Sequence, residues 1–203
     1  EAQGHAAGVE AIRPIVRHAS DLGVEALTIY AFSRENWQRS SEEVETLIAL
    51  LESSIRDETP ELIEQGVRVR LAGRLGELRA ETRASIEQAV EATAGGERMV
   101  LNVAFNYSSR LEIVDAFRAY VDEGNRVAEL DEEALSEYLY TAGLPDPDLL
   151  IRTGGDQRVS NFLLWQAAYA ELYFCDCYWP DFGPVELDAA IEEFGRRSRR
   201  FGR

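Results

Sequence analysis

Apolar residues recur along the chain with two periods, one typical of helices and the other typical of strands. Residues 6–22 carry apolar side chains on one helical face, and Pro14 indicates a kink or a late helix start. Ser40 and Glu43 form a capping box before a helix with a broad apolar stripe. The pattern predicts helices over residues 6–22, 40–55, 80–94, 110–123, 131–140 and 186–199.

Short apolar runs between these helices have the length and composition of strands. The run over 24–32, VEALTIYAF, is nearly continuously apolar, as in a strand buried on both faces. Over 67–71 apolar residues alternate with Arg68 and Arg70, which indicates a half-exposed strand. The pattern predicts strands over residues 24–32, 67–71, 99–105, 149–151 and 170–175.

Strands that alternate with helices predict an α/β fold with a mostly parallel central sheet flanked by helices. Sheets of this kind bind ligands beyond the carboxyl ends of their strands. We therefore expect the functional residues in the loops that follow Phe32, Phe105 and Ile151.

Length and charge narrow the class of protein. The 203 residues suit a single domain over 1–203, and the formal net charge is −16, with Arg supplying all 21 basic residues. An acidic surface repels nucleic acid, so we expect no nucleic-acid partner, and a local group of Arg indicates a bound phosphate. No apolar run approaches the roughly 18 residues of a spanning helix, and no secretory signal is visible, which favours a cytoplasmic protein.

Cys175 and Cys177 are the two cysteines of the chain. Residues two apart in a strand point to the same face, so the two thiols should share one face. No second cysteine pair or nearby histidine completes a zinc site. We interpret them as small buried thiols of a cytosolic protein.

The loop after Phe32 concentrates reactive side chains. Its residues 33–39, SRENWQR, hold an acid, two arginines, an amide and an indole. This composition favours a ligand site, and the alternative is a solvated loop with Trp37 packed on the core. The loop after the third strand, NYSSR at 106–110, would by itself be explained as a turn and helix cap.

The loop after Ile151 indicates a diphosphate site. Gly154 and Gly155 let backbone N–H groups approach an anion. Arg152 and Arg158 offer planar guanidinium groups to phosphate oxygens, and the Ser160 hydroxyl adds a donor.

Glu171 stands in an otherwise apolar strand, ELYF. A carboxylate is costly to bury without a partner, so Glu171 should either form a salt bridge or hold a hard cation. Mg²⁺ typically uses one or two protein carboxylates together with substrate phosphates.

Five segments occur in the order found in one known family: SRENWQRS, LNVAFNYSSR, DLLIRTGGDQRVSNFLLWQAAYAELYF, YWPDF and RRFGR. Over essentially the whole chain they resemble the cis-prenyltransferases, such as the bacterial undecaprenyl diphosphate synthases. The resemblance implies a transferase that condenses isopentenyl diphosphate with an allylic diphosphate, farnesyl or geranyl, to give a cis-polyprenyl diphosphate. It also implies Mg²⁺ as cofactor, a homodimer, a hydrophobic tunnel beside the sheet, and peripheral membrane association through the lipid product.

The resemblance further implies roles for individual residues. Asn36 would lie near the proton that is removed, and Glu171 would help to bind Mg²⁺. His5, in a match to GH-x-x-G, would lie by the allylic diphosphate, and the segment 200–202 would reach across the dimer interface. The remaining implied substrate-binding residues are Ser33, Arg34, Glu35, Trp37, Arg39, Arg152, Arg158, Val159 and Ser160.

A growing hydrocarbon chain needs an apolar tunnel, because each buried CH₂ group contributes about 0.8 kcal/mol. For each residue expected to line the tunnel, the alternative is that its side chain packs in the ordinary core. The residues expected to line the tunnel are Ala31, Val44, Leu47, Ile48, Leu51, Met99, Leu101 and Val103.

The chain departs from the family in three places. The family's N-terminal strand and its MDGNGRWA-like loop, whose Asp is the main metal and catalytic carboxylate, are missing. An Arg usually shortly precedes the GH motif, whereas Glu1 stands four residues before His5, and the usual NYGGR is NYSSR. We therefore expect the fragment as given to be inactive. Two alternatives are a non-catalytic partner subunit of a prenyltransferase, which the retained RTGG residues argue against, and a branching isoprenyl synthase on the same fold.

Overall fold

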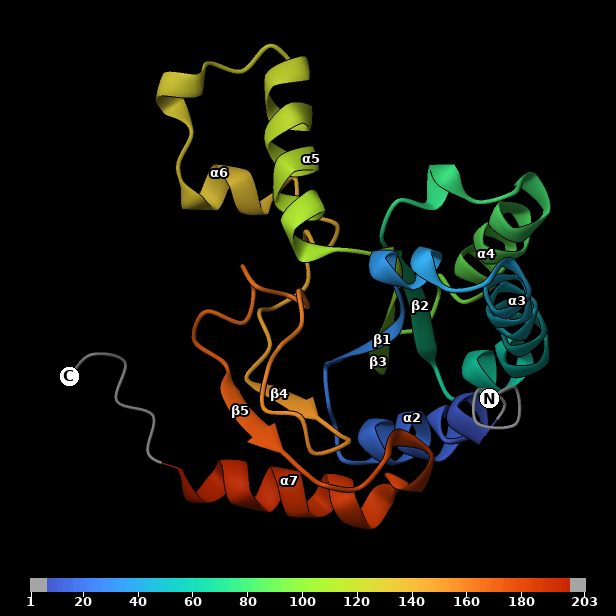
Figure 1. Cartoon of the computed structure of the whole chain (residues 1–203). Helices are drawn as coiled ribbons and strands as arrows, with labels where there is room; N and C mark the ends of the chain where they lie inside the picture. The colour runs from blue at the N-terminus through green and yellow to red at the C-terminus, as the bar shows by residue number, and fades with distance from the viewer. Residues whose placement is uncertain (1–6, 198–203) are drawn as a thin grey trace.

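The computed structural model describes residues 7–197, in which strands alternate with helices (Figure 1). All five predicted strands form, each within two residues of its predicted bounds. The strands are β1 (Ala26–Ser33), β2 (Val67–Ala72), β3 (Met99–Tyr107), β4 (Leu149–Arg152) and β5 (Glu171–Phe174). The helices are α2 (Ile12–Asp21), α3 (Ser41–Glu64), α4 (Ala80–Ala92), α5 (Ser109–Asp122), α6 (Glu132–Ser136) and α7 (Pro184–Arg196).

Helix bounds differ most from the predicted ones at three places. The first predicted helix is interrupted at Ala11, and Pro14 lies in the first turn of α2, where a missing N–H costs no helical hydrogen bond. α3 continues past residue 55 through Pro60. α6 ends at Ser136 and gives way to turns.

Every strand pairing in the structure is parallel, which confirms the predicted α/β class. β3 lies between β1 and β2 in a three-stranded sheet, and β4 pairs with β5 in a two-stranded sheet. Figure 1 shows α3 and α4 on one side of the larger sheet and α7 below the smaller one. Because β1 and β3 are parallel neighbours, their carboxyl ends point to the same edge of the larger sheet, as the sequence predicts.

β3 is buried on both faces. Met99 and Leu101 pack in a core cluster with α2, and Phe105 packs with residues of α3 and α4. On the other face, Ala104 and Tyr107 pack against the 162–167 segment. The run MVLNVAF is accordingly apolar except for the buried Asn102. The prediction that 24–32 is buried on both faces is wrong, because only Ile29 and Phe32 of β1 are buried.

An apolar cavity of about 130 Å³ lies between the larger sheet and helices α2 and α3. It occupies the place expected for the tunnel. The wall includes five of the residues predicted for it, Ala31, Leu47, Leu51, Leu101 and Val103. The other three, Val44, Ile48 and Met99, pack in the closed core instead.

Two irregularities at the ends of β1 and β3 shape the site. Tyr30 pairs with Ala104 and Phe32 pairs with Phe105, so Ala31 is an extra residue in β1. One step later Asn106 is the extra residue in β3, where it adopts a φ of 50°. Bulges re-aim side chains next to active sites, and here they turn Ala31 to the cavity and Asn106 to the neighbouring loops.

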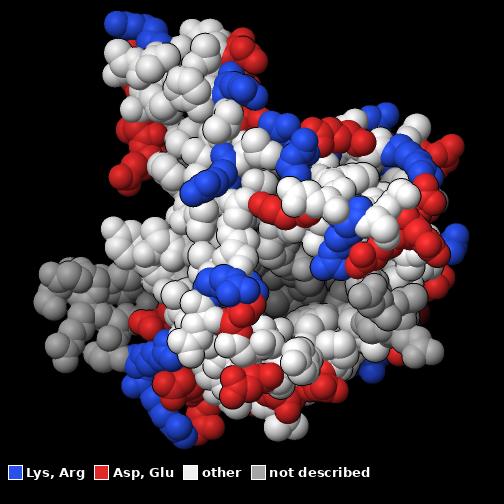
Figure 2. Space-filling model, in the orientation of Figure 1, with Lys and Arg blue, Asp and Glu red and all other residues white. Residues whose placement is uncertain are grey.

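Charged side chains of both signs are interspersed over the face shown in Figure 2, with an uncharged hollow near the middle. In the part of the chain that the structure describes, no helix has the length and apolar character needed to cross a membrane.

Candidate active site

The loop after β1 forms a short 3₁₀ helix, η1 (Arg34–Gln38). The Ser33 N–H donates a hydrogen bond of 2.8 Å to Asn36 Oδ1, so the Asn36 amide holds the start of this helix. The Trp37 ring packs edge-on against Phe32, with ring centroids 5.5 Å apart, and remains 41% exposed. The loop is thus ordered by its own side chains at the carboxyl edge of the sheet.

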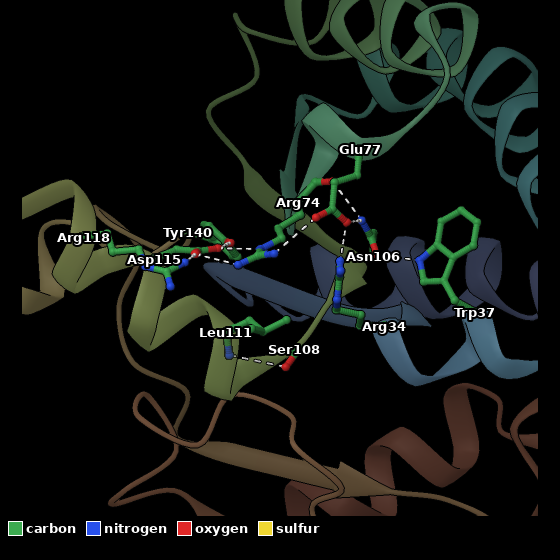
Figure 3. A network of polar contacts seen from close by, with 10 residues as sticks. All are labelled: Arg34, Trp37, Arg74, Glu77, Asn106, Ser108, Leu111, Asp115, Arg118 and Tyr140. Carbon is green, nitrogen blue, oxygen red and sulfur yellow. Dashed lines mark hydrogen bonds and ion pairs between the residues drawn. The ribbon is translucent and has the colours of Figure 1, made fainter. Parts of the chain in front are cut away.

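Asn106 ties η1 to the loop after β2. Its Oδ1 accepts a hydrogen bond from Trp37 Nε1 at 2.7 Å, and its Nδ2 donates to the Arg74 carbonyl at 2.9 Å and to Glu77 at 3.1 Å. Arg34 forms an ion pair with the same Glu77 carboxylate (Figure 3). The Asn106 side chain is fully buried, and all of its polar atoms are used.

The polar network continues from Glu77 to α5. Arg74 contacts Glu77 at 3.2 Å and donates two hydrogen bonds of 2.8 Å to Asp115 (Figure 3). Hydrogen bonding from Arg74 lowers the pKa of Asp115, against a smaller opposing effect of burial. Burial raises the pKa of Tyr140, whose hydroxyl also contacts Asp115.

The loop after β4 gathers two guanidinium groups around one carboxylate. Arg152 donates to Asp156 at 2.9 Å and to the Ser160 hydroxyl at 2.9 Å, while Arg158 donates to the same Asp156 oxygen at 2.6 Å. Asp156 is therefore the anion that both guanidinium groups hold in this structure. The sequence predicts that the N–H groups of Gly154 and Gly155 approach an anion. In the structure these N–H groups instead donate to carbonyls within the protein.

Asn161 joins the three loops. Its Nδ2 donates to Glu35 at 2.9 Å and to the Ser108 hydroxyl at 2.9 Å, while its Oδ1 accepts from the Arg110 N–H at 2.9 Å. Burial opposes the ionisation of Glu35, but hydrogen bonds from Asn161, its own backbone and Ser33 outweigh it and lower the pKa of Glu35. A carboxylate that stays ionised therefore faces the junction of the loops.

Glu171 lies away from this junction. It pairs with Leu149 at the start of the smaller sheet, whereas Arg152 pairs with Phe174 three residues later, roughly 10 Å along the strands. Its Oε2 forms an ion pair with Arg197 Nη1 at 3.1 Å. Of the two outcomes predicted for this carboxylate, the salt bridge is the one observed.

Metal-binding side chains do not converge in the described residues. Over residues 7–197, no three His, Cys, Asp or Glu side chains lie together closely enough to hold a metal ion. Asp156 and Glu171 are each engaged by arginine. The described residues of one chain therefore do not form a Mg²⁺ site by themselves.

The structure brings most of the predicted residues to one edge. Glu35 binds Asn161 of the loop after β4, and Ser33 and Asn36 bind each other in the same turn as Glu35. Arg152 and Arg158 both bind Asp156, and Arg152 also binds Ser160. The loop residue Val159 is half-buried, and Arg39 instead pairs with Glu43 along α3. His5 and the segment 200–202 lie outside the described residues.

Sequence reasoning missed the residues that connect these loops. Asn161, Asn106 and Glu77 carry the connections between segments, but the sequence shows each only as an ordinary polar residue. The one available signal is position, because Asn161 and Asn106 lie inside the two family motifs, in SNFLL and NYSSR.

Comparisons with known proteins all indicate the same family of enzymes. A prenyltransferase family model described as undecaprenyl diphosphate synthase matches residues 1–202. An isoprenyl transferase of Brucella suis is 50% identical over 203 residues, covering 98% of this chain and 80% of that protein. An isoprenyl transferase of Bacillus anthracis is 48% identical over 203 residues, covering 98% of this chain and 79% of that protein.

Two solved structures share the fold along almost the entire chain. A lavandulyl diphosphate synthase of Lavandula x intermedia in complex with dimethylallyl diphosphate gives a TM-score of 0.95 at 35% identity, covering 100% of this chain and 89% of that chain. A probable undecaprenyl diphosphate synthase of Campylobacter jejuni gives a TM-score of 0.87 at 32% identity, covering 97% of this chain and 92% of that chain.

Proposed function

The chain belongs to the undecaprenyl diphosphate synthase family of prenyltransferases, and from this premise we propose how it holds its substrates. It is a cis-prenyltransferase, an enzyme that condenses isopentenyl diphosphate with an allylic diphosphate. The observation that carries the residue assignments is the pair of Asn161 hydrogen bonds, which joins the arginine loop to Glu35 after β1 and to Ser108 after β3.

In our proposal, Arg152, Arg158 and Ser160 bind the diphosphate of isopentenyl diphosphate, with Val159 beside it. Diphosphate oxygens displace the Asp156 carboxylate from the two guanidinium groups, because planar guanidinium forks match phosphate oxygens and form charge-assisted hydrogen bonds. That both guanidinium groups already share one anion supports this proposal.

The allylic diphosphate lies nearer to η1 in this proposal, with His5, Arg34, Trp37 and Arg39 as further contacts. Its C–O bond breaks, the double bond of isopentenyl diphosphate attacks the allylic carbon, and a proton leaves to give the new cis double bond. Cationic side chains stabilise the negative charge that develops on the departing diphosphate.

Three residues of the Ser33–Asn36 turn act near the reacting carbons in our proposal. Glu35 stays ionised, since its pKa is lowered, and stabilises positive charge on the allylic carbon. Asn36 lies by the proton that leaves, and Ser33 fixes its amide through the 2.8 Å hydrogen bond.

Mg²⁺ as cofactor and Glu171 as its ligand remain proposals that rest on the family. For Glu171 to bind the ion, its carboxylate must leave Arg197, and substrate phosphates and water must supply most of the ligands. Incorporation of isopentenyl units that persisted unchanged in excess chelator would rule out the metal requirement.

The apolar cavity receives the hydrocarbon chain in this proposal. It lies beside Ala31 at the end of β1, between β3 and α3, and its wall is mostly apolar. The polar residues of the wall are Arg13, Ser54, Glu58, Thr59, Glu61 and Gln65. At about 0.8 kcal/mol per buried CH₂ group, successive isoprene units favour staying in the cavity over leaving it.

A homodimer is also proposed. α5 presents an apolar stripe of Val114, Phe117 and Val121, each 38–41% exposed. Exposed apolar stripes of this kind mark interaction surfaces. Light scattering on the wild type and on Phe117→Glu tests it, and a wild-type monomer would contradict it. A cytoplasmic location and a peripheral membrane association through the lipid product complete the proposal.

The experiment that tests the function uses the full-length protein with radiolabelled isopentenyl diphosphate and farnesyl or geranyl diphosphate. We expect incorporation into longer cis-polyprenyl diphosphates. A branching synthase on the same fold is the second candidate, favoured by the TM-score of 0.95 to the lavandulyl diphosphate synthase. That enzyme class would instead join two allylic units, so a product formed from dimethylallyl diphosphate alone would favour branching.

A further inference from the structure

The two cysteines lie side by side directly behind the arginine loop. Cys175 Sγ and Cys177 Sγ are 2.8 Å apart, and both residues are half-buried free thiols. β5 ends at Phe174 and the backbone then bends at Asp176, which brings the two thiols together against the core cluster of α2 and α7. The two thiols do lie together, but the predicted reason is wrong, because β5 ends before Cys175 and the bend, not a shared strand face, brings them together.

The backbone of this dithiol segment is the support of the arginine loop. The Cys175 N–H donates to the Arg152 carbonyl at 3.0 Å. In return, the Gly155 N–H donates to the Cys175 carbonyl at 3.0 Å and the Gly154 N–H donates to the Cys177 carbonyl at 2.8 Å. Both glycines have φ values near 80°, which other residues rarely adopt, so glycine is needed at both positions for the loop to make these bonds.

We propose that Cys175 and Cys177 form an oxidisable dithiol site for small-molecule disulfides, and that the bond formed there weakens diphosphate binding by the loop of Arg152. The second part rests on the proposed role of that loop. A disulfide has an S–S length of about 2.05 Å, so the two sulfurs need to approach each other by roughly 0.8 Å.

The reaction is a two-step thiol–disulfide exchange. The Cys177 thiolate attacks a disulfide RSSR, which gives a mixed disulfide at Cys177 and releases RS⁻. The Cys175 thiol then loses its proton to solvent and attacks the Cys177 sulfur, which forms the internal disulfide and releases the second RS⁻. The dithiol is oxidised, RSSR is reduced to two thiols, and no other reactant is needed.

Cys175 is the thiol held in its protonated form. Burial, followed by hydrogen bonding and charge from Cys177, raises the pKa of Cys175. We therefore expect Cys177 to react first. Once Cys177 is a mixed disulfide, its contribution to the raised pKa of Cys175 disappears and the second step is easier.

Closing the bond moves the carbonyls that hold the loop. The Cys175 and Cys177 carbonyls belong to the residues whose side chains would be drawn together, and they are the acceptors for Gly155 and Gly154. We expect the KM for isopentenyl diphosphate to rise about tenfold on oxidation and to return on reduction with dithiothreitol.

The test uses the full-length protein, reduced and then incubated with glutathione disulfide. Intact mass should fall by two hydrogens, and peptide mapping should place the bond between Cys175 and Cys177. Cys175→Ser should stop at a glutathione adduct on Cys177, whereas Cys177→Ser should remain largely unmodified. Both serine variants should keep the reduced enzyme's KM for isopentenyl diphosphate under oxidising conditions.

The outcomes separate this inference from the proposed function. An unchanged mass, or a disulfide with an unchanged KM, would overturn the inference. If the reduced protein showed no condensation at all, the proposed function would fail, while the mass result would still decide the dithiol. Binding of inorganic diphosphate to the reduced and oxidised forms would then report on the loop in place of KM.

Discussion

The indole N–H of Trp37 donates a 2.7 Å hydrogen bond to the side-chain carbonyl of Asn106, 69 residues away in the sequence. Asn106 is the extra residue of the bulge in β3, and its φ of 50° is one that Asn tolerates better than most residues. The same amide also binds Arg74 and Glu77. One buried side chain thus sets how η1 sits on the sheet.

Replacing Asn106 should therefore affect both stability and turnover. Asn106→Ala removes three hydrogen bonds of a buried group and should lower the free energy of unfolding by about 1–3 kcal/mol. Turnover should fall because η1 loses its anchor. Trp37→Phe keeps the ring but removes the N–H, so it should show a smaller loss of both. A melting curve and turnover equal to the wild type in Asn106→Ala would contradict this account.

Arg152→Ala and Arg158→Ala should each raise the KM for isopentenyl diphosphate and lower turnover. A charge-assisted hydrogen bond contributes about 1.5–3 kcal/mol, which corresponds to roughly 10- to 150-fold in kcat/KM. Stability should change little, because both side chains are paired with a half-exposed carboxylate.

Arg126→Ala is the matched control for these two variants. Arg126 is a surface residue that forms an ion pair with Glu129, so its removal should leave the kinetics unchanged. Wild-type kinetics in either Arg152→Ala or Arg158→Ala would show that the loop is structural.

Asn36→Ala should lose turnover more than affinity, because the proposed role of the amide lies in proton removal. The structure adds a complication, since Asn36 also accepts the Ser33 N–H at the start of η1. Asn36→Asp keeps this acceptor but not the amide N–H₂ group. It should retain the wild-type melting temperature while turnover stays low. A raised KM with intact turnover in Asn36→Ala would place the residue in binding only.

The fold was largely predictable because periodicity and burial agree. β3 is buried on both faces, and its apolar run marks it as a strand of a parallel sheet. The carboxyl ends of β1 and β3 lie at one edge of the larger sheet, so the loops after Phe32 and Phe105 could be assigned to one site. β4 belongs to the smaller sheet, and its loop joins them through the hydrogen bond from Asn161 to Glu35.

The finer arrangement could not be predicted, because it depends on irregularities that have no period. A strand that is apolar on both faces gives no sign of a bulge at Ala31 or Asn106. The carboxylate of Glu171 has no sequence feature that distinguishes an ion pair with Arg197 from a metal ligand. Tertiary contacts also decide which residues of a polar motif contact the substrate and which residues hold the loops together.

Stability should depend on pH through Asp115. Hydrogen bonding from Arg74 lowers the pKa of Asp115 below its unfolded value near 3.9, so its contribution is fully present above that pH and is lost as pH falls through the lowered pKa. Asp115→Asn should lower the free energy of unfolding by about 1.5–3 kcal/mol at pH 7. The difference from the wild type should shrink below about pH 4.

Urea unfolding of both proteins at several pH values measures this difference. Asp57→Asn is a suitable control, because Asp57 is an exposed residue paired with Arg56, and its effect should stay within about 0.5 kcal/mol at every pH. A difference for Asp115→Asn that stayed constant from pH 7 to pH 3 would mean that the ion pair with Arg74 does not stabilise the fold.

Product length should depend on Ala31. It is the extra residue of the bulge in β1 and is exposed although Phe32 next to it is buried, because its methyl group faces the apolar cavity together with Leu47 and Val103. Ala31→Leu adds bulk at the carboxyl end of β1, where the growing chain enters the cavity in our proposal. We expect shorter products, with the first condensation intact and a small change in melting temperature.

Ala104→Leu is the matched control on the opposite face of the sheet. Ala104 is fully buried in solid packing beside Tyr107, so a Leu there should cost about 1–3 kcal/mol of stability through overpacking and leave the product distribution of the folded enzyme unchanged. Thin-layer analysis of product length beside a melting curve distinguishes the two substitutions. An unchanged length distribution with a lowered melting temperature in Ala31→Leu would show that Ala31 contributes to packing and not to the path of the product, because only a residue on that path changes where elongation stops.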